Sequence, residues 1–345
     1  MKTTTHPIGL IPDLNTIHLG DSLSVLKSWP DEFVQCVVTS PPYWGLRDYG
    51  VNGQLGLEKT PEEYVSKMTI IFREIRRVLK KDGTLWLNLG DSYASDTKGS
   101  GGMNSKIQNT NAGSRYESRR LDHGLKQKDL VGIPWRIAFA LQADGWYLRS
   151  DIIWSKPNPM PESVTDRPTR SHEYIFLLSK SHQYFYDSDA IKEKAIYFDD
   201  NRKDRSEEFD NLIPTAQTNG VHPRKSDKQR GHSRRHAGFN DRWDAMDKTE
   251  QCSAMRNKRD VWTIATNPFP EAHFATFPEG ISMNCIKAGS RPEDIILDPF
   301  MGSGTTGQVA KRLKRNYLGI ELNPEYIDIA KRKIGAEDNP LLVEA

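Results

Sequence analysis

Residues 295–307 read IILDPFMGSGTTG, and this stretch decides the fold class. Ile295 to Leu297 predict a buried strand, Met301 to Gly307 predict a tight turn, and a helix carrying Val309 and Leu313 should follow. The turn fits the pattern G-x-G-x-x-G, in which missing side chains let a cofactor approach the backbone. It lacks the Gly-Lys-Thr/Ser of a nucleoside-triphosphate loop, so a nicotinamide, flavin or other cofactor site and a plain structural turn stay open.

Strands and helices alternate on both sides of this stretch. Tyr317 to Glu321 predict the next strand, and Asn323-Pro324 predict a helix start with asparagine as the N-cap. Near the N-terminus, Thr16 to Leu19 and Cys36 to Thr39 predict strands on either side of a short helix, Ser22 to Ser28. The expected fold class is therefore α/β, with a doubly wound, mostly parallel sheet.

The middle of the chain adds three strands and the clearest helix. That helix is expected from Pro61 to Lys80, because Thr60 and Glu63 form a capping box and Gly83 follows its basic end. The remaining elements are expected as strands at Thr84 to Leu89, Leu148 to Trp154 and Glu173 to Leu178, and a helix at Ile133 to Gln142.

Charge is balanced over the whole chain but concentrated locally. Lys and Arg total 48 against 46 Asp and Glu, so the net charge of +2 does not by itself indicate a polyanionic partner. Basic residues gather in two segments, Val221 to His236 and residues 92–129. The second segment is rich in Gly, Ser and Asn and is expected to form a long mobile loop. From residue 187 to 260 apolar periodicity fades, which predicts an inserted module.

No metal site, membrane span or export signal is expected. The three cysteines lie far apart and outside any metal-ligand spacing, which indicates a reducing compartment. His222, His232 and His236 lack cysteine or carboxylate partners at ligand spacing. Residues 1–15 lack the apolar core of a signal peptide, and no run approaches the roughly 18 apolar residues of a membrane span. A soluble cytoplasmic protein is expected.

The sharpest motif is TSPPYW, residues 39–44, which directly follows an apolar strand and so lies at the carboxyl edge of the sheet. Its two prolines fix the backbone and leave carbonyl acceptors without N–H donors, while the tyrosine offers an aromatic face. An exocyclic amine needs such acceptors and such a surface. Glu321 ends a strand where an acid can bind both hydroxyls of a ribose, although a surface glutamate is the alternative.

These motifs, in this order, resemble the amino-methylating DNA methyltransferases of the β class, and the resemblance covers nearly the whole chain. It implies S-adenosylmethionine as the cofactor and double-stranded DNA as the substrate, in a prokaryotic cell or phage. It implies a seven-stranded Rossmann-like sheet, circularly permuted so that the C-terminal strands lie beside Thr16 to Leu19. A restriction-modification role is expected, and a separate cognate restriction endonuclease and a homodimer stay open.

The resemblance also assigns the site. Ser40, Pro41, Pro42 and Tyr43 match the motif that binds the target amine. Asp21 matches the acid near the adenine amine, Glu321 the ribose-binding acid, and the segment before the glycine turn, with Phe274, Thr276 and Phe277, the part that holds the methionine end. The cofactor loop itself corresponds to Asp298, Pro299, Phe300, Gly302, Gly304 and Thr305.

The resemblance divides the chain into a catalytic part, residues 1–186, a target-recognition region, 187–260, and a cofactor-binding part, 261–345. Basic residues of the recognition region are expected to contact DNA phosphates, with a solvated segment as the alternative. They are Arg224, Lys225, Arg234 and Arg235.

Ser40 bears on the product. Within the family, Ser-Pro-Pro-Tyr more often accompanies N4-cytosine methylation and Asp-Pro-Pro-Tyr N6-adenine methylation, so N4-cytosine is favoured and N6-adenine is the alternative. Cytosine C5 methylation requires a cysteine after a proline, and none is present. Methylation of RNA or of a protein amide is a more distant alternative, which the motif order and Ser40 argue against.

Overall fold

The computed structural model describes residues 10–46, 50–94, 124–194, 255–266 and 278–338. Contacts divide the chain into one unit of Met1–Ile191 with Arg259–Ala345 and a second unit of Lys192–Lys258. Within the described part of the second unit, β6 (Glu193–Lys194) pairs with β7 (Met255–Arg256) in antiparallel fashion. The basic loop expected within residues 92–129 falls largely outside the described residues.

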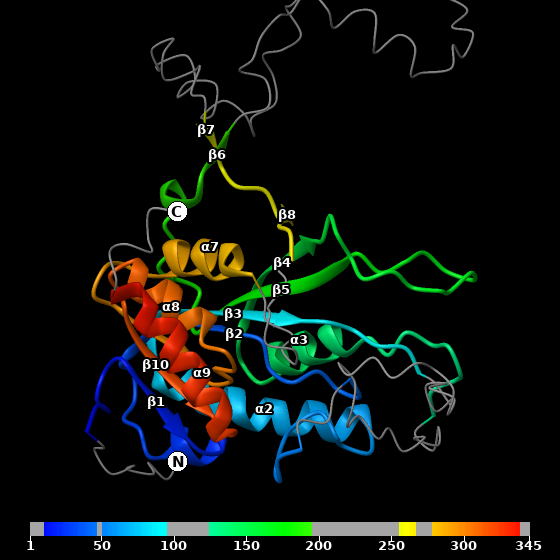
Figure 1. Ribbon diagram of the computed structural model, residues 1–345, viewed down its shortest axis with the longest axis horizontal. Coiled ribbons are helices and arrows are strands. Elements are labelled where there is room, and N and C mark those ends of the chain that lie inside the picture. Colours follow the sequence, from blue (N-terminus) through cyan, green and yellow to red (C-terminus); the bar gives the residue numbers. More distant parts are fainter. Residues whose placement is uncertain (1–9, 47–49, 95–123, 195–254, 267–277, 339–345) are drawn as a thin grey trace, which may run out of the picture. The chain divides into compact units, whose positions relative to one another are not determined.

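The first unit is built on one mixed sheet, whose strands are labelled in Figure 1. Its strand order is β1-β10-β9-β2-β3-β5-β4-β8, in which β1, β10, β9, β2 and β3 run parallel and β5 is antiparallel to both of its neighbours. The strands are β1 (Thr16–Leu19), β2 (Val34–Thr39), β3 (Leu79–Leu89), β4 (Tyr147–Ser155), β5 (His172–Ser179), β8 (Val261–Thr263), β9 (Ile295–Asp298) and β10 (Asn316–Glu321).

The circular permutation expected from the sequence is confirmed. β1 pairs in parallel with β10, with Thr16 opposite Leu318 and Leu19 opposite Glu321. Because both strands end at the same edge, the turn after β1 meets the end of β10, and the Gly20 N–H donates to the Glu321 carbonyl oxygen at 2.9 Å. Residues from opposite ends of the chain therefore share one edge of the sheet.

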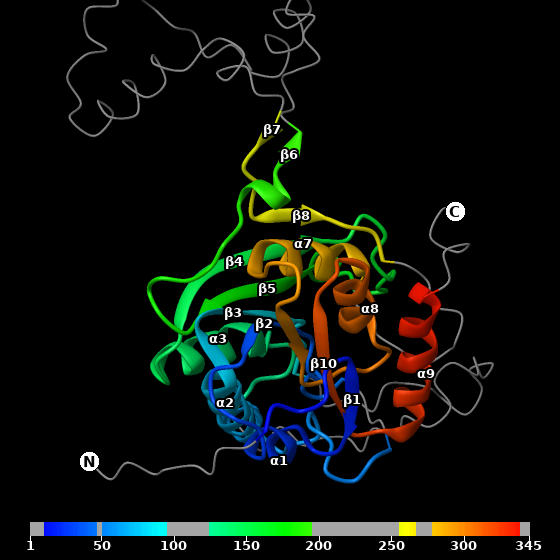
Figure 2. The ribbon, with the colours of Figure 1, turned by 90° about the vertical axis from the view of Figure 1, so that its left-hand side faces the viewer.

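Helices cover both faces of the sheet, as Figure 2 shows. The helices are α1 (Ser22–Lys27), α2 (Pro61–Val78), α3 (Ile133–Ala143), α7 (Glu279–Gly289), α8 (Thr305–Arg312) and α9 (Pro324–Gly335), with short 3-10 turns at Asp189–Ile191 and Ala336–Asp338. In β2, Val37 packs with α1, α2 and α3, whereas Cys36 and Val38 pack with α7, α8 and α9. Alternate residues of a strand thus enter two separate cores.

The expected strands are all present, but the sheet has an eighth strand, so the expectation of seven was wrong. β8 adds Val261–Thr263 in parallel to the outer edge of β4. Three residues are too short to show the alternation by which a strand is found in a sequence. Helix α7 was not expected either, and it covers the face that includes Trp262.

The boundary between α2 and β3 also differs from the expectation. The helix ends at Val78 rather than at Lys80, and the strand begins at Leu79 rather than at Thr84. Leu79 donates the last helical bond to Ile75 yet has an extended ψ of 135°, and it pairs with Val34 on β2. A buried leucine fits a helix stripe and a strand equally well, so only this long-range pairing fixes the boundary.

Both expected caps form. The Thr60 hydroxyl accepts from the Glu63 N–H at 3.1 Å, and Asn323 caps α9 by accepting from the Glu325 N–H at 3.0 Å. The Glu63 carboxylate reaches the Lys59 N–H at 3.1 Å, one residue before the partner that a capping box uses. None of the described helices combines the length and the apolar character of a membrane span.

Candidate active site at the carboxyl edge of the sheet

The glycine turn after β9 is held by backbone bonds to two carboxylates. The Phe300 N–H donates to Asp298 Oδ1 at 3.1 Å, and the Gly302 N–H donates to Glu321 Oε2 at 2.8 Å. Gly304 has a φ of +83°, and a Cβ atom there would lie 2.8 Å from Ala330 Cβ. Gly304 is therefore required for the packing of α8 against α9, and it does not line the neighbouring cavity.

Glu321 closes the turn from β10. Its second oxygen accepts from the Asn323 N–H at 2.9 Å, so both carboxylate oxygens are fixed by backbone donors. Burial raises the pKa of this carboxyl, which the backbone bonds partly offset. A carboxylate has about four acceptor sites, so each oxygen keeps capacity for a ligand hydroxyl.

Asp298 links three elements beneath the turn. It is 2% exposed, and it accepts from the Thr39 hydroxyl at 2.7 Å and from the Thr306 hydroxyl at 2.8 Å. Burial raises its pKa to about 6, since three hydrogen bonds offset only part of the desolvation. Its carboxylate thus joins β9 to the end of β2 and to α8, and it braces the cofactor turn against the target-amine motif.

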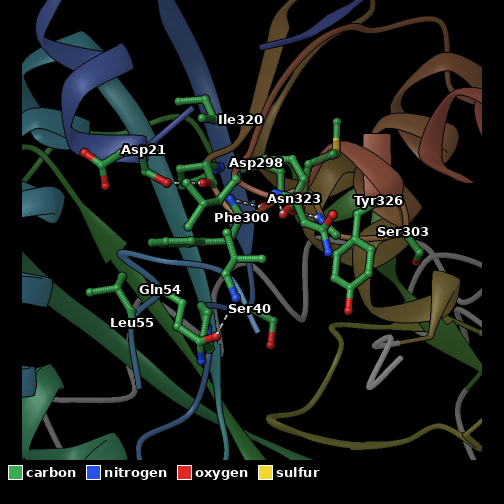
Figure 3. A pocket seen from close by; sticks show the side chains of 18 of the residues that line it. Asp21, Ser40, Gln54, Leu55, Asp298, Phe300, Ser303, Ile320, Asn323 and Tyr326 are labelled. Atoms are coloured by element: carbon green, nitrogen blue, oxygen red, sulfur yellow. Dashed lines mark hydrogen bonds between the residues drawn. The ribbon is translucent and has the colours of Figure 1, made fainter. Parts of the chain in front are cut away.

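One cleft of about 1000 Å³, part of it open to solvent, joins the predicted cofactor residues to the target-amine motif. Figure 3 shows Asp21, Ser40, Asp298 and Phe300 around it. The predicted residues that line the cleft are Asp21, Ser40, Pro42, Asp298, Pro299, Phe300, Gly302, Thr305 and Glu321, whereas Pro41, Tyr43 and Gly304 do not.

Part of the wall of this cleft is formed by residues that were not expected from the sequence to belong to the site. Gln54 and Leu55 lie in the segment after the target-amine motif, and Asn323 and Tyr326 lie at the start of α9. That first segment is folded back on the motif, because the Gly45 N–H donates to the Gly56 carbonyl oxygen at 2.9 Å. The sequence of this segment has no apolar periodicity that could have predicted the contact. At Asn323 the sequence predicted a helix start but not a place in the cleft wall.

The backbone of the target-amine motif is anchored from α2. The Tyr64 hydroxyl donates to the Pro42 carbonyl oxygen at 2.6 Å. The ring of Tyr43 packs on Gly90, where a Cβ atom would lie 2.6 Å from the ring. The loop is therefore rigid, and Ser40 is held at the cleft by the end of β2.

Behind the motif lies a polar cluster formed by Asn88, Glu173 and Lys156. The two N–H donors of Asn88 Nδ2 are shared among three acceptors, Tyr43 Oη at 2.7 Å, Glu173 Oε2 at 2.9 Å and Ser40 Oγ at 3.3 Å. Lys156 forms an ion pair with the other oxygen of Glu173. The Asn88 amide oxygen is buried and has no hydrogen-bond partner among the described residues, which costs about 1–3 kcal/mol.

Several predicted residues lie outside the described part of the chain. These are Phe274, Thr276 and Phe277 of the cofactor segment, and Arg224, Lys225, Arg234 and Arg235 of the recognition region. Among the described residues, no group of three or more His, Cys, Asp or Glu could hold a metal ion. The described cysteines, Cys36 and Cys285, are buried free thiols, and burial raises the pKa of the Cys36 thiol to about 12, far from that of a nucleophile.

A sequence model of DNA methylases matches residues 34–332. The chain belongs to this family. The type II methyltransferase M.SmaI of Serratia marcescens is 46% identical over 320 residues, which cover 92% of this chain and 90% of the relative. M.Cfr9I of Citrobacter freundii, also a type II methyltransferase, is 44% identical over 329 residues, with 95% and 90% covered.

Solved structures show the same fold. PvuII DNA methyltransferase (cytosine-N4-specific) has a TM-score of 0.57 at 18% identity, with 94% of this chain and 87% of that chain covered. TTHA0409 of Thermus thermophilus, solved with S-adenosylmethionine, has a TM-score of 0.53 at 22% identity, with 93% of each chain covered. The chain is a type II DNA methyltransferase of the family that methylates exocyclic amines, and the cofactor of this family is S-adenosylmethionine.

The residues of the cleft fit this cofactor. Apart from its two chain neighbours, a Cβ atom on Gly302 would meet no atom of the described residues closer than the Phe300 carbonyl oxygen at 3.9 Å, so this part of the turn is not packed against them. Asp21 caps α1 with Oδ1, and Oδ2 accepts no hydrogen bond from the described residues. Glu321 and Asp21 can therefore accept from ribose hydroxyls and a purine amine, while Ile320 and Phe300 offer apolar walls.

Proposed function

We propose that this enzyme methylates the N4 amine of a cytosine that is flipped out of duplex DNA, with N6-adenine methylation as the alternative. One observation supports this most directly: Ser40 at the end of β2 and Glu321 at the end of β10 line the same cleft. A methyl donor held by Glu321 and an amine held by Ser40 would then meet without any movement of the sheet.

The target amine is a poor nucleophile, because its lone pair is delocalised into the ring and its hydrogens are paired in the duplex. Flipping the base costs a few kcal/mol and brings the amine to the protein. We assign its hydrogens to Ser40, which lines the cleft, and to the carbonyl oxygen of Pro41, which lies next to Ser40 in the chain. We assign stacking on the base to the ring of Tyr43, which lies beside Ser40 but outside the cleft that is assigned to the cofactor.

Bound S-adenosylmethionine supplies an electrophilic methyl group. The protein contributes alignment and electrostatic stabilisation, and no covalent intermediate with the enzyme is needed. The buried thiols of Cys36 and Cys285, whose pKa values burial raises, suit that route. A serine hydroxyl at position 40, rather than an aspartate, favours N4-cytosine within the family.

Target recognition is assigned to the unit Lys192–Lys258, whose boundaries lie close to the stretch without periodicity in the sequence. Its basic residues would contact phosphates, which adds affinity and salt sensitivity without sequence information. A separate cognate endonuclease and a homodimer would fit a restriction-modification enzyme and stay part of the proposal.

Two variants test whether the Ser40 end of the cleft binds the target amine and the Glu321 end binds the cofactor. Ser40→Ala should lower the rate of N4-methylcytosine formation about 100-fold with little change in cofactor Kd, as expected when one stabilising contact of the transition state is lost. Glu321→Gln should instead raise the cofactor Kd, measured by calorimetry. The reverse pattern would show that the two ends of the cleft have been assigned wrongly.

A further inference from the structure

We propose that Glu173 is a positioning residue for methyl transfer, acting on the target amine through a hydrogen-bonded chain of Tyr43 and Ser40. The proposal rests on the function given above, because it needs an amine at Ser40. The chain joins separate elements, since Ser40 and Tyr43 follow β2 and Glu173 lies on β5. Its outer end, Ser40, lines the cleft.

The hydroxyl hydrogens of the chain have one consistent direction. An ionised carboxylate can only accept, so the Tyr43 hydroxyl donates to Glu173 Oε2 at 2.7 Å. That bond uses the single hydroxyl hydrogen of Tyr43, and Ser40 must therefore donate across its 3.2 Å contact with Tyr43. Asn88 Nδ2 can only donate, and it approaches both hydroxyl oxygens. Ser40 Oγ is thus left to act as an acceptor toward the cleft.

This direction matters for the amine. A chain of hydrogen bonds that ends on a carboxylate is polarised along its length, so Ser40 Oγ becomes a stronger acceptor than an isolated hydroxyl. A stronger acceptor draws an amine hydrogen toward Ser40 and frees the nitrogen lone pair from the ring. Glu173 does this without touching the base, because Tyr43 and Ser40 lie between them.

The same chain of hydrogen bonds provides a path for the proton that the methylated amine must lose. The amine nitrogen forms a bond to the methyl carbon, the carbon–sulfur bond breaks, and its electron pair stays on sulfur. The methylated nitrogen then carries one proton too many. That proton passes to Ser40 Oγ while the Ser40 hydrogen passes to Tyr43 and the Tyr43 hydrogen passes to Glu173, which later releases it to water.

Glu173 is held in place on both sides. Its side chain is 14% exposed, with Oε1 paired to Lys156 and Oε2 facing Tyr43 and Asn88. Lys156 follows β4 and lies over the Trp154 ring, 4.4 Å from its centroid. Trp154 is the strand partner of Glu173. The carboxylate is therefore fixed by the pairing of β4 with β5, in surroundings where little water screens its charge.

The test measures single-turnover methylation of mixed-sequence duplex DNA by full-length protein. Glu173→Gln keeps the size of the side chain but removes its charge, and Tyr43→Phe keeps the ring but removes the hydroxyl. Each should slow methyl transfer about 100-fold, with cofactor Kd and Tm close to those of the wild type. The double variant should be no slower than either single variant, because both interrupt one chain.

Two controls separate charge from structure. Glu162→Gln removes a different carboxylate, which lies in the segment between β4 and β5 and pairs with Arg167, and it should leave the rate unchanged. Lys156→Met combined with Glu173→Gln removes the whole ion pair. It should be as slow as Glu173→Gln alone, whereas recovery of the rate would show that an unpaired ammonium caused the loss.

Other outcomes overturn the proposal. A rate within about threefold of the wild type for Glu173→Gln or Tyr43→Phe would contradict a role for the hydrogen-bonded chain. Losses that multiply in the double variant would show that the two residues act independently. The proposed function fails separately, if the wild-type product is not N4-methylcytosine. The rate comparison can still be read on whichever methylated base forms.

Discussion

Gly304→Ala should destabilise the fold far more than it affects the chemistry of the cleft. The φ of Gly304 is +83°, which costs a residue with a side chain about 1–2 kcal/mol. The new methyl group would also lie 2.8 Å from Ala330 Cβ and 3.0 Å from Ala330 Cα. Overpacking of this kind costs about 1–3 kcal/mol, so the free energy of unfolding should fall by about 2–5 kcal/mol.

Gly302→Ala is the matched control two residues away. Its φ is +52°, but a Cβ atom would meet nothing in the described part of the chain closer than 3.9 Å, so only the backbone cost of about 1–2 kcal/mol is expected. Because Gly302 lines the cleft, its substitution should weaken cofactor binding, and Gly302→Val should abolish it. Urea unfolding followed by tryptophan fluorescence measures the first effect and calorimetry the second. Equal stability losses in the two alanine variants would refute the packing argument.

Three further outcomes are expected. Tyr43→Ala should slow methyl transfer more than about 100-fold, because it removes the stacking ring as well as the hydroxyl. The cofactor Kd, measured by calorimetry, should change little, since Tyr43 does not line the cleft. Burial raises the pKa of Asp298 from 3.8 to about 6, so the folded state binds this proton more tightly than the unfolded state. The resulting stability is present below about pH 4 and is lost as pH rises through 6, on the order of 3 kcal/mol, and Asp298→Asn should flatten this dependence in urea titrations. Neutralising four basic residues together should lower DNA affinity and reduce its salt slope by up to about 3.6, and an unchanged slope would contradict the phosphate assignment. They are Arg224, Lys225, Arg234 and Arg235.

The sequence predicted most of the fold where local signals were strong. Apolar runs such as Ile295 to Leu297 became strands, and the caps at Thr60 and Asn323 formed. The sequence failed where a partner distant in the chain decides the structure. Leu79 is a strand residue because Val34 lies beside it, and Val261–Thr263 is a strand because β4 offers a free edge.

The site divides in the same way. Glycine and proline motifs identified Ser40 and Gly302, and its place at the end of a predicted strand identified Glu321. The fold brings all three to one cleft. Asn88 gave no such signal, because a polar residue in a strand is recognisable as part of a site only when its neighbours are known. Gly304 shows the converse, since its motif position suggested the cofactor but its space is taken by Ala330.

The identity of the methylated nucleoside tests the central claim most directly. Purified protein should be incubated with mixed-sequence duplex DNA and S-adenosylmethionine carrying a ¹³C-methyl group, and the DNA hydrolysed and examined by mass spectrometry. The account predicts labelled N4-methyldeoxycytidine. Labelled N6-methyldeoxyadenosine would contradict the inference drawn from Ser40, and the absence of any labelled nucleoside, with cofactor binding intact, would contradict the assignment of the amine site.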